Sequence, residues 1–319
     1  MVKVAVAGGT GDIAREVIDK ILAKNQHEVI VLTHRPLSSQ SKDLGAVKHV
    51  HVDYTDTHGL TAVLMGTDVV LSFLASVDFD AAIKAQKNLI DASIKAGVRR
   101  IAPSEWACPD NTFLPHYKWK DAVRDYLENI NRDEKKIEYT LFQPGLITNF
   151  FAYPHSTTRH FSKFPWFVDF ENRRAIVVGD GDQHFTTTTV EDLSSVVAEA
   201  IDYKGEWPVR GGVAGSRVTV MQLIKLAENL RGPIKVDRIT VEDLQAGHFT
   251  ASWAWLPSIK HPDLTPAQGE AFLKQIMVAY TLSTAKGAWD GTNEWNLRLP
   301  GYQFVGAEEY LRDVWENVR

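Results

Sequence analysis

The sequence predicts an α/β protein built on a doubly wound parallel β-sheet. Three observations support this fold class. Across residues 1–145, short apolar runs alternate with longer segments whose apolar residues recur at helical spacing, which is the pattern of βαβ units. A glycine-rich turn separates the first apolar run from the first helical segment. The chain of 319 residues is also long enough for a nucleotide-binding domain and a smaller second domain.

The elements of this first part follow from their apolar patterns. Strands are predicted where the apolar runs are short and bounded by polar residues or glycine, at 2–7, 27–33, 47–53, 68–73, 98–103 and 138–142. Helices are predicted between them at 12–23, 59–65, 81–97 and 117–130. Gly97 suits the left-handed conformation that often follows a helix C-terminus.

The elements after Gly145 are shorter and less regular. Residues 146–175 are rich in Phe, Pro, His and Trp and show no clear period. Strands are predicted at 175–178 and 233–239, a tight turn at 179–181, and helices at 190–201, 219–230, 266–279 and 307–318. We therefore expect a Rossmann-type domain at 1–152 plus about 185–203, and a smaller, interleaved α+β substrate domain at about 153–184 plus 204–319.

Composition and charge limit the partners of the chain. The net charge of −5 argues against a nucleic-acid backbone or an anionic membrane surface as the main partner. Cys108 is the single cysteine, so no intramolecular disulfide and no metal site are predicted. The chain shows no signal peptide, and no apolar run approaches the roughly 20 residues that span a bilayer. We expect a cytoplasmic protein, a monomer or a homodimer, that binds a small molecule.

The glycine-rich turn has the composition of a dinucleotide-binding site. Gly8 permits a tight turn, Gly11 lets the backbone approach a pyrophosphate, and Ala14 is small enough for close packing of helix and strand. Free N–H groups at the start of the helix then bind the phosphates. The candidate pyrophosphate-binding residues are Gly8, Thr10, Gly11, Asp12 and Ile13. The alternative is a tight turn without a ligand.

The end of the second strand favours NADP(H) as the cofactor. An acidic residue there would bind the ribose hydroxyls of NAD, whereas this chain has Arg35. The planar guanidinium of Arg35 suits a 2′-phosphate, and Lys42 follows within reach. The alternative is that Arg35 is a solvated surface cation.

The ends of two further strands are candidate cofactor contacts. Ser72, Phe73 and Leu74 end the fourth strand and are expected beneath the adenosine or the nicotinamide ribose, with plain strand packing as the alternative. Ser104 follows the fifth strand, where doubly wound sheets build their sites, and is expected to contact the cofactor. Its neighbour Glu105 is expected to cap a turn.

Together these segments resemble the isoflavone reductase-like, or NmrA-like, branch of the atypical short-chain dehydrogenases. That branch includes plant reductases of phenylcoumaran benzylic ethers and pinoresinol, and fungal NmrA-type proteins. The matching segments are its GGTGxxG turn at 8–13, its PSEFG segment at 103–107, its sixth strand and exit at 138–151, and its later GDG region at 179–192. The resemblance implies the fold for residues 1 to about 205. Trp106 and Ala107 stand where the plant enzymes have Phe-Gly, which indicates a different substrate.

The resemblance also implies a catalytic lysine on the helix after the PSEFG segment, and the matching position is Lys120. At about 100° per residue, Lys120 lies roughly 80° from the centre of the apolar stripe of that helix, and Lys118 roughly 120°. Partial burial at this boundary would lower the pKa of Lys120 and make it a usable acid or base. The alternative is a lysine that snorkels over apolar surface. Tyr117, three residues earlier, is a second catalytic candidate, with a packed aromatic as the alternative.

Four aromatic residues are candidate substrate contacts: Trp106, Phe150, Tyr153 and Trp166. The density of aromatic residues around them supports an aromatic or polycyclic ligand, and core packing is the alternative. The sequence thus predicts an NADPH-dependent reductase of a conjugated, aromatic or alkaloid-like molecule in specialised metabolism, with Lys120 as general acid or base. Two alternatives stay open. One is an enzyme of the same family that binds NADP(H) and catalyses a non-redox isomerisation. The other is an NmrA-type redox sensor, which regulates a partner protein without turnover.

Overall fold

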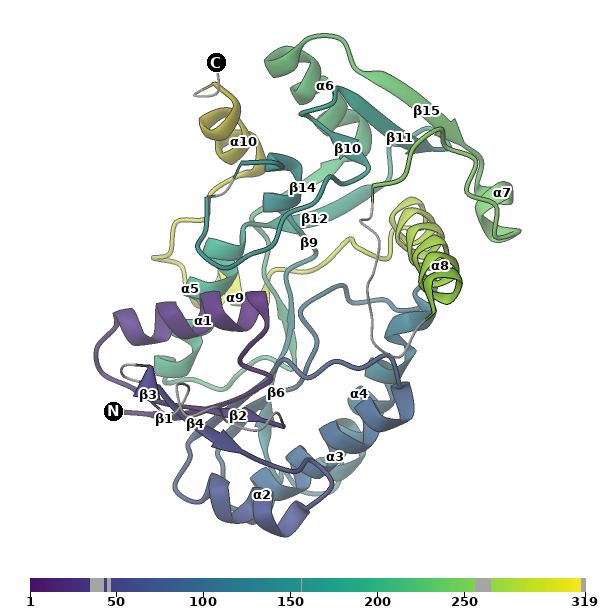
Figure 1. The fold of residues 1–319 in the computed structure, drawn as a ribbon. Helices are drawn as coiled ribbons and strands as arrows, with labels where there is room; N and C mark the ends of the chain where they lie inside the picture. Colours follow the sequence, from purple (N-terminus) through teal and green to yellow (C-terminus); the bar gives the residue numbers. More distant parts are fainter. Residues whose placement is uncertain (35–42, 45–46, 156, 256–264, 317–319) are drawn as a thin grey trace.

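In a computed structural model, the first part of the chain forms a seven-stranded sheet (Figure 1). The structure describes residues 1–34, 43–44, 47–155, 157–255 and 265–316. The strand order is β3-β4-β2-β1-β5-β6-β7. The bounds are β1 Lys3–Ala7, β2 Glu28–Thr33, β3 Asp43–Leu44, β4 Val47–His51, β5 Val69–Ser72, β6 Arg100–Ala102 and β7 Glu138–Tyr139. Every neighbouring pair is parallel except β3 and β4. This order confirms the predicted Rossmann-type fold class.

Helices cover both faces of this sheet. The side chains of β1 and its neighbours are apolar on both faces, and each face is buried against a helix layer. Val4 and Val6 face α1 (Asp12–Ala23) and α5 (Val190–Asp202). Ala5 and Ala7 face the opposite layer. That layer consists of α2 (Thr57–Leu64), α3 (Phe79–Lys95) and α4 (Lys118–Ile130). Figure 1 shows the two layers on opposite sides of the sheet.

The helices of this part begin and end close to the predicted positions. The helix α1 has the predicted bounds. The helix α3 begins two residues earlier than predicted, since the Asp78 side chain accepts a hydrogen bond from the Ala81 backbone N–H. Gly97 has a φ of +76°, the left-handed conformation expected after this helix. The residues at the ends of these helices were therefore sufficient to predict their approximate bounds.

The predicted strand at 138–142 is wrong as a single element. Its first half is β7, while its second half belongs to β8 (Leu141–Gln143), which pairs with β13 (Arg210–Gly212) in a separate sheet. The division occurs because the Leu141 backbone N–H donates to the Val209 carbonyl, in a segment distant in sequence.

The second part of the chain contains two small sheets and several helices. One sheet joins β14 (Ser216–Thr219), β12 (His184–Thr188) and β9 (Leu146–Ile147), and the other joins β10 (Val168–Asp169), β11 (Arg174–Val178) and β15 (Lys235–Ile239). The helices are α6 (Val220–Arg231), α7 (Val241–Gln245), α8 (Pro266–Ala285), α9 (Glu294–Arg298) and α10 (Ala307–Glu316). Single turns of 3₁₀ helix occupy Pro115–Tyr117 and Thr148–Ala152. The short strands β9, β10, β12, β13 and β14 and the helices α7 and α9 were not predicted.

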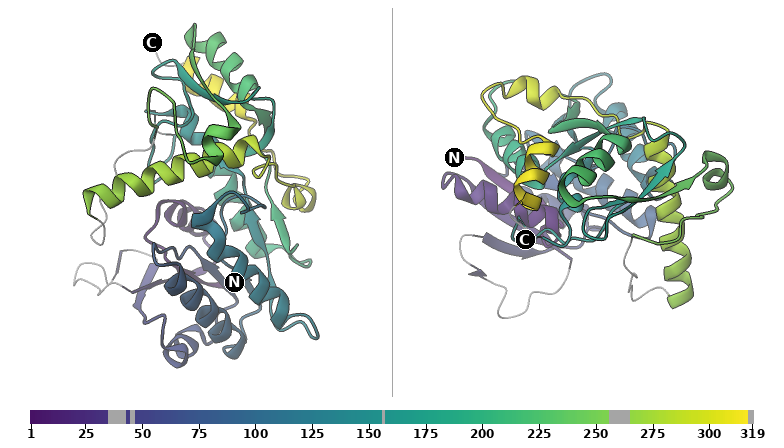
Figure 2. Two further views of the ribbon diagram at one scale, coloured as in Figure 1. Left: turned by 90° about the vertical axis from the view of Figure 1, so that its right-hand side faces the viewer. Right: turned by 90° about the horizontal axis from the view of Figure 1, so that it is seen from above.

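Two lobes result, and α8 crosses between them (Figure 2, left). We call the seven-stranded sheet with α1–α5 the first lobe, and the two small sheets with α6–α8 and α10 the second lobe. Each lobe has a core of its own: Phe167, Phe185 and Trp315 are buried in the second lobe, while Val17 and Leu71 are buried in the first. Among the helices of the described ranges, none combines the length and the apolar composition needed to cross a membrane.

Candidate active site

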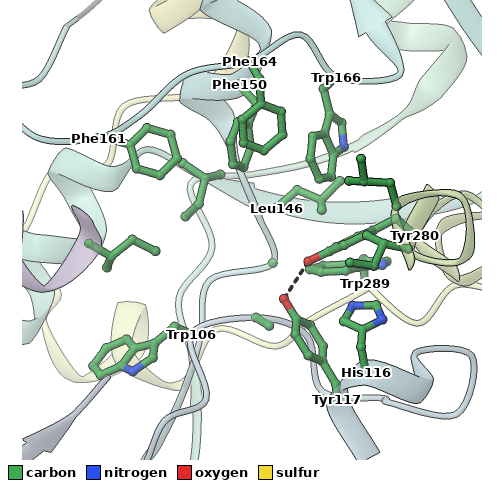
Figure 3. A pocket seen from close by; sticks show the side chains of 16 residues that line it. Trp106, His116, Tyr117, Leu146, Phe150, Phe161, Phe164, Trp166, Tyr280 and Trp289 are labelled. Atoms are coloured by element: carbon green, nitrogen blue, oxygen red, sulfur yellow. Dashed lines mark hydrogen bonds between the residues drawn. The ribbon is translucent and has the colours of Figure 1, made fainter. Parts of the chain in front are cut away.

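Two adjoining cavities lie where the lobes meet. The larger, of about 530 Å³, is a groove that runs past the glycine turn to Lys120. The smaller, of about 360 Å³, has mostly aromatic and aliphatic walls (Figure 3). Seven residues line both cavities: Ile13, Trp106, His116, Tyr117, Phe150, Phe161 and Phe164. The two cavities therefore share much of their walls and lie side by side.

The glycine turn forms one end of the groove. Gly8 has a φ of +73°, and a Cβ on this residue would lie 2.9 Å from the backbone carbonyl of Phe73, so only glycine fits. Gly11, Asp12 and Ile13 line the groove. Gly8 and Thr10 belong to the same turn but are not lining residues. Gly11 is exposed at the N-terminus of α1, but its backbone N–H donates to the Gly8 carbonyl at 3.2 Å, so the N–H groups of Asp12 and Ile13 are the ones open to an anion.

The carboxylates of α1 hold a segment of the second half of the chain over this turn. The Asp12 side chain accepts hydrogen bonds from the Ser162 backbone N–H at 3.0 Å and from Arg15 at 2.8 Å. Glu16 accepts hydrogen bonds from the backbone N–H groups of His160 and Phe161, the latter at 3.1 Å. The Asp12 carboxylate is therefore already hydrogen-bonded within the protein, and only the backbone of this residue is free to bind a phosphate.

The predicted contacts at the strand ends lie in different places. Phe73 and Ser104 line the groove. The Ser72 side chain is fully buried and accepts a hydrogen bond from Gln86 on α3 at 3.0 Å, so it faces away from the groove. Leu74 packs against the core on the α3 side. Arg35 and Lys42 lie outside the described residues.

Lys120 lies in the wall of the groove with only 6% of its surface exposed. Its Nζ donates a hydrogen bond to the Glu105 backbone carbonyl and lies 4.2 Å from the centre of the Tyr117 ring. Burial lowers the pKa of Lys120 to about 8, because the charged ammonium loses its water. This lysine can therefore release or accept a proton near neutral pH.

Glu105 does not have the predicted turn-capping role. Its carboxylate is 1% exposed and forms an ion pair with Arg124, with distances of 3.0 Å from Nε and 2.5 Å from Nη2. Arg124 also donates hydrogen bonds to the backbone carbonyls of Cys108 and Pro109. The loop after β6 is thus fixed against α4. One feature of the sequence pointed to this ion pair: Arg124 lies four residues after Lys120, on the same face of the helix, and so faces the same loop.

Trp106 separates the groove from the apolar cavity. Its backbone has a φ of +51°, which is unusual for a side chain of this size. The indole stacks on Phe73 at 4.2 Å on one face and on Phe142 at 5.3 Å on the other. Its N–H donates to the Ser72 carbonyl at 2.7 Å. Because these contacts fix the ring, Trp106 is a rigid wall of both cavities.

The apolar cavity brings together three of the four predicted substrate contacts. Trp106, Phe150 and Trp166 line it, and the rings of Phe150 and Trp166 stack at 4.7 Å. Tyr153 lines neither cavity.

Three residues form the polar part of this cavity: His116, Tyr117 and Tyr280 (Figure 3). The hydroxyls of Tyr117 and Tyr280 lie 2.6 Å apart. Burial raises the pKa of Tyr117 to about 12 and holds that of Tyr280 well above its usual range. Burial also lowers the pKa of His116 to about 4, so its ring is neutral at neutral pH. Sequence analysis missed His116 and Tyr280, and Tyr280 is 163 residues away from its partner.

Comparisons with known proteins agree with this architecture. The model of the NmrA-like family matches residues 2–236. The oxidoreductase swnN of Metarhizium robertsii is 28% identical, over 99% of this chain and 98% of that protein. The NADPH-dependent quinone oxidoreductase of Escherichia coli, solved with NADPH, has a TM-score of 0.68 at 19% identity, over 98% of this chain and 99% of the other. The leucoanthocyanidin reductase of Vitis vinifera, also solved with NADPH, has a TM-score of 0.70 at 18% identity, over 99% and 100%. These solved structures share the fold.

Proposed function

The chain belongs to the NmrA-like family, as its resemblance predicted, and from this premise we propose that it is an NADPH-dependent reductase of a conjugated, aromatic or alkaloid-like small molecule. The observation that carries the proposal is the position of Lys120. This buried lysine lies in the wall of a groove that starts at a glycine turn and adjoins an aromatic cavity. The oxidoreductase name of the fungal relative supports the same class of reaction.

The groove fits NADP(H) in three respects. The turn after β1 brings a Cβ-free Gly8 against β5, which leaves the N-terminus of α1 facing the groove. The backbone N–H groups of Asp12 and Ile13, at the N-terminus of α1, would hold the pyrophosphate. Ile13, Phe73 and Ser104 would line the path of the cofactor toward Lys120. When bound, NADPH supplies a hydride for an electrophilic carbon.

The residues of the chain would supply the proton and the environment. Lys120 would donate a proton to the substrate oxygen next to the carbon that is reduced. Its hydrogen bond to the Glu105 carbonyl fixes the position of Nζ. The aromatic walls exclude water and orient a planar molecule beside Trp106. A protein that only senses NADP(H) has no need of a buried lysine with a lowered pKa, so this residue favours an enzyme over a sensor.

The proposed role of Lys120 predicts a pH dependence. A general acid must carry its proton, and the pKa of Lys120 is about 8 instead of its usual 10.5. We expect kcat to be constant below pH 7 and to fall about tenfold per pH unit well above 8. The measurement is NADPH oxidation between pH 6 and 10 with a panel of aromatic enones and quinones. A rate that rises through pH 8 would assign Lys120 as a base instead.

Arg35 is proposed to select NADPH over NADH. In a titration followed by tryptophan fluorescence, we expect NADPH to bind more tightly than NADH, because a charge-assisted contact to the 2′-phosphate is worth a factor of roughly 10 to 100. Arg35→Ala should remove this preference and leave the affinity for NADH unchanged, which serves as the internal control. If neither dinucleotide binds the unsubstituted protein, the proposed function is wrong.

The finer features of the function are also proposals. Specialised metabolism is supported by the aromatic cavity, and a cytosolic location by the single cysteine, which is buried as a free thiol. A non-redox isomerase would use the same groove and the same lysine. It would differ from a reductase in one measurable respect, since it would consume no NADPH during turnover.

A further inference from the structure

The hydroxyls of Tyr117 and Tyr280 form a pair that is incomplete within the described part of the chain. Their oxygens lie 2.6 Å apart, so one proton occupies the space between them. Both residues keep their protons at neutral pH, because burial raises both pKa values. The pair therefore carries a second O–H proton. Among the residues that the structure describes, neither hydroxyl has another hydrogen-bond partner to accept it.

The location of the pair shows where this second O–H group can donate. Both side chains line the apolar cavity, and Figure 3 shows both hydroxyl oxygens turned toward its interior. Tyr117 comes from the turn before α4 in the first lobe, and Tyr280 comes from α8 in the second lobe. A donor left unpaired among apolar walls is costly, because it has lost its hydrogen bonds to water. A ligand oxygen in the cavity would remove this cost.

We infer that the Tyr117–Tyr280 pair is a recognition site for one oxygen atom of the substrate. The pair donates one hydrogen bond to a hydroxyl or carbonyl oxygen carried on an aromatic ring, while the ring lies against Phe150 and Trp166. One hydroxyl donates to the other, and the second donates to the ligand, so the bound oxygen completes the pair. His116 packs against both rings, at 4.4 and 5.2 Å between centres, and holds them in place.

The chemistry of this site selects against positively charged groups. His116 is neutral and no acidic side chain of the described residues lines the cavity, so the cavity offers no counter-charge to an amine, while the Lys120 ammonium lies 4.2 Å from the Tyr117 ring centre. The inference rests on the proposed function for the identity of the cavity as a substrate site. It adds the requirement for an aromatic ligand without a positive charge, with an oxygen placed to reach the tyrosine pair.

The test compares two probes that differ by one hydroxyl, 2-naphthol and naphthalene. Their dissociation constants are measured by equilibrium dialysis at pH 7 on the full chain, with and without NADP⁺. We expect 2-naphthol to bind roughly three to ten times more tightly, the net value of one hydrogen bond. Tyr117→Phe and Tyr280→Phe should each keep part of this preference, because the remaining hydroxyl is then free to donate.

The double variant should lose the preference entirely. Tyr310→Phe is the matched control, since Tyr310 also forms a hydroxyl–hydroxyl hydrogen bond, part-buried and 2.8 Å long, with Thr157, but lies outside the cavity. A loss of folding or of cavity shape would weaken the binding of both probes together. The ratio of their two dissociation constants therefore isolates the contact of the hydroxyl. An unchanged ratio in the double variant, or no preference in the unsubstituted protein, overturns the inference. The NADPH titration tests the proposed function separately, because failure to bind NADPH leaves the probe ratio measurable.

Discussion

Replacing Lys120 with methionine is expected to lower kcat by roughly 10²- to 10⁴-fold, the usual contribution of a positioned acid or base. Methionine has a similar length and no titratable group, so the groove keeps its shape while the proton donor is lost. We expect NADPH affinity to change little. The measurements are steady-state NADPH oxidation and a fluorescence titration with NADPH.

Lys118→Met is the matched control for this substitution. Lys118 lies on the same helix, but its side chain is 55% exposed and its ion pair with Asp121 is at the surface. We expect this variant to keep its full activity. Thermal stability also distinguishes a catalytic role of Lys120 from a structural one. Burial disfavours the charged lysine, so Lys120→Met should leave the thermal midpoint unchanged or raise it. Full activity in Lys120→Met would remove the lysine from the mechanism.

Replacing Arg124 with methionine is expected to destabilise the protein by about 3 to 5 kcal/mol, because it leaves the Glu105 carboxylate buried without a partner. The hydrogen bonds of Arg124 to the Cys108 and Pro109 carbonyls are lost as well. Denaturant unfolding measures the change.

A second substitution distinguishes the ion pair from simple packing. In an Arg124→Met background, Glu105→Gln should restore part of the lost stability, since a neutral amide is less costly to bury than a carboxylate. Arg217→Gln is a control at the surface, where the ion pair with Asp290 is solvated and should contribute little. If Arg124→Met unfolds at the same denaturant concentration as the unsubstituted protein, the buried pair has no structural role.

Local patterns were sufficient to predict most of the first lobe, with the strand predicted at 138–142 as an exception. The helix α1 has its predicted bounds because its apolar period and the preceding glycines lie within one short segment. Lys120 was singled out because the family resemblance implied a lysine on this helix, and the apolar stripe of the helix placed it at the boundary of the buried face. The second lobe was harder to predict, because strands such as β9 and β10 have only two residues each, and β9 exists through pairing with the distant strand β12.

Long-range contacts explain the missed parts of the site. Nothing near Tyr280 in the sequence indicates that α8 reaches Tyr117 across the lobe boundary. Glu105 was expected at a turn, but Arg124 lies nineteen positions later, and their pairing depends on how α4 packs. The Trp106 backbone was equally unpredictable, since a positive φ is rare for tryptophan and depends here on the stack with Phe73 and Phe142.

The walls of the apolar cavity have a consequence for divergence among related proteins. Lys120 and the glycine turn belong to the first lobe, whereas Phe164, Trp166, Tyr280 and Trp289 pack with the core of the second. Mutations in those four residues alter the space offered to a ligand without moving the lysine or the turn. An ancestral chain of this architecture can therefore acquire new ligands by drift in one lobe while selection preserves the other.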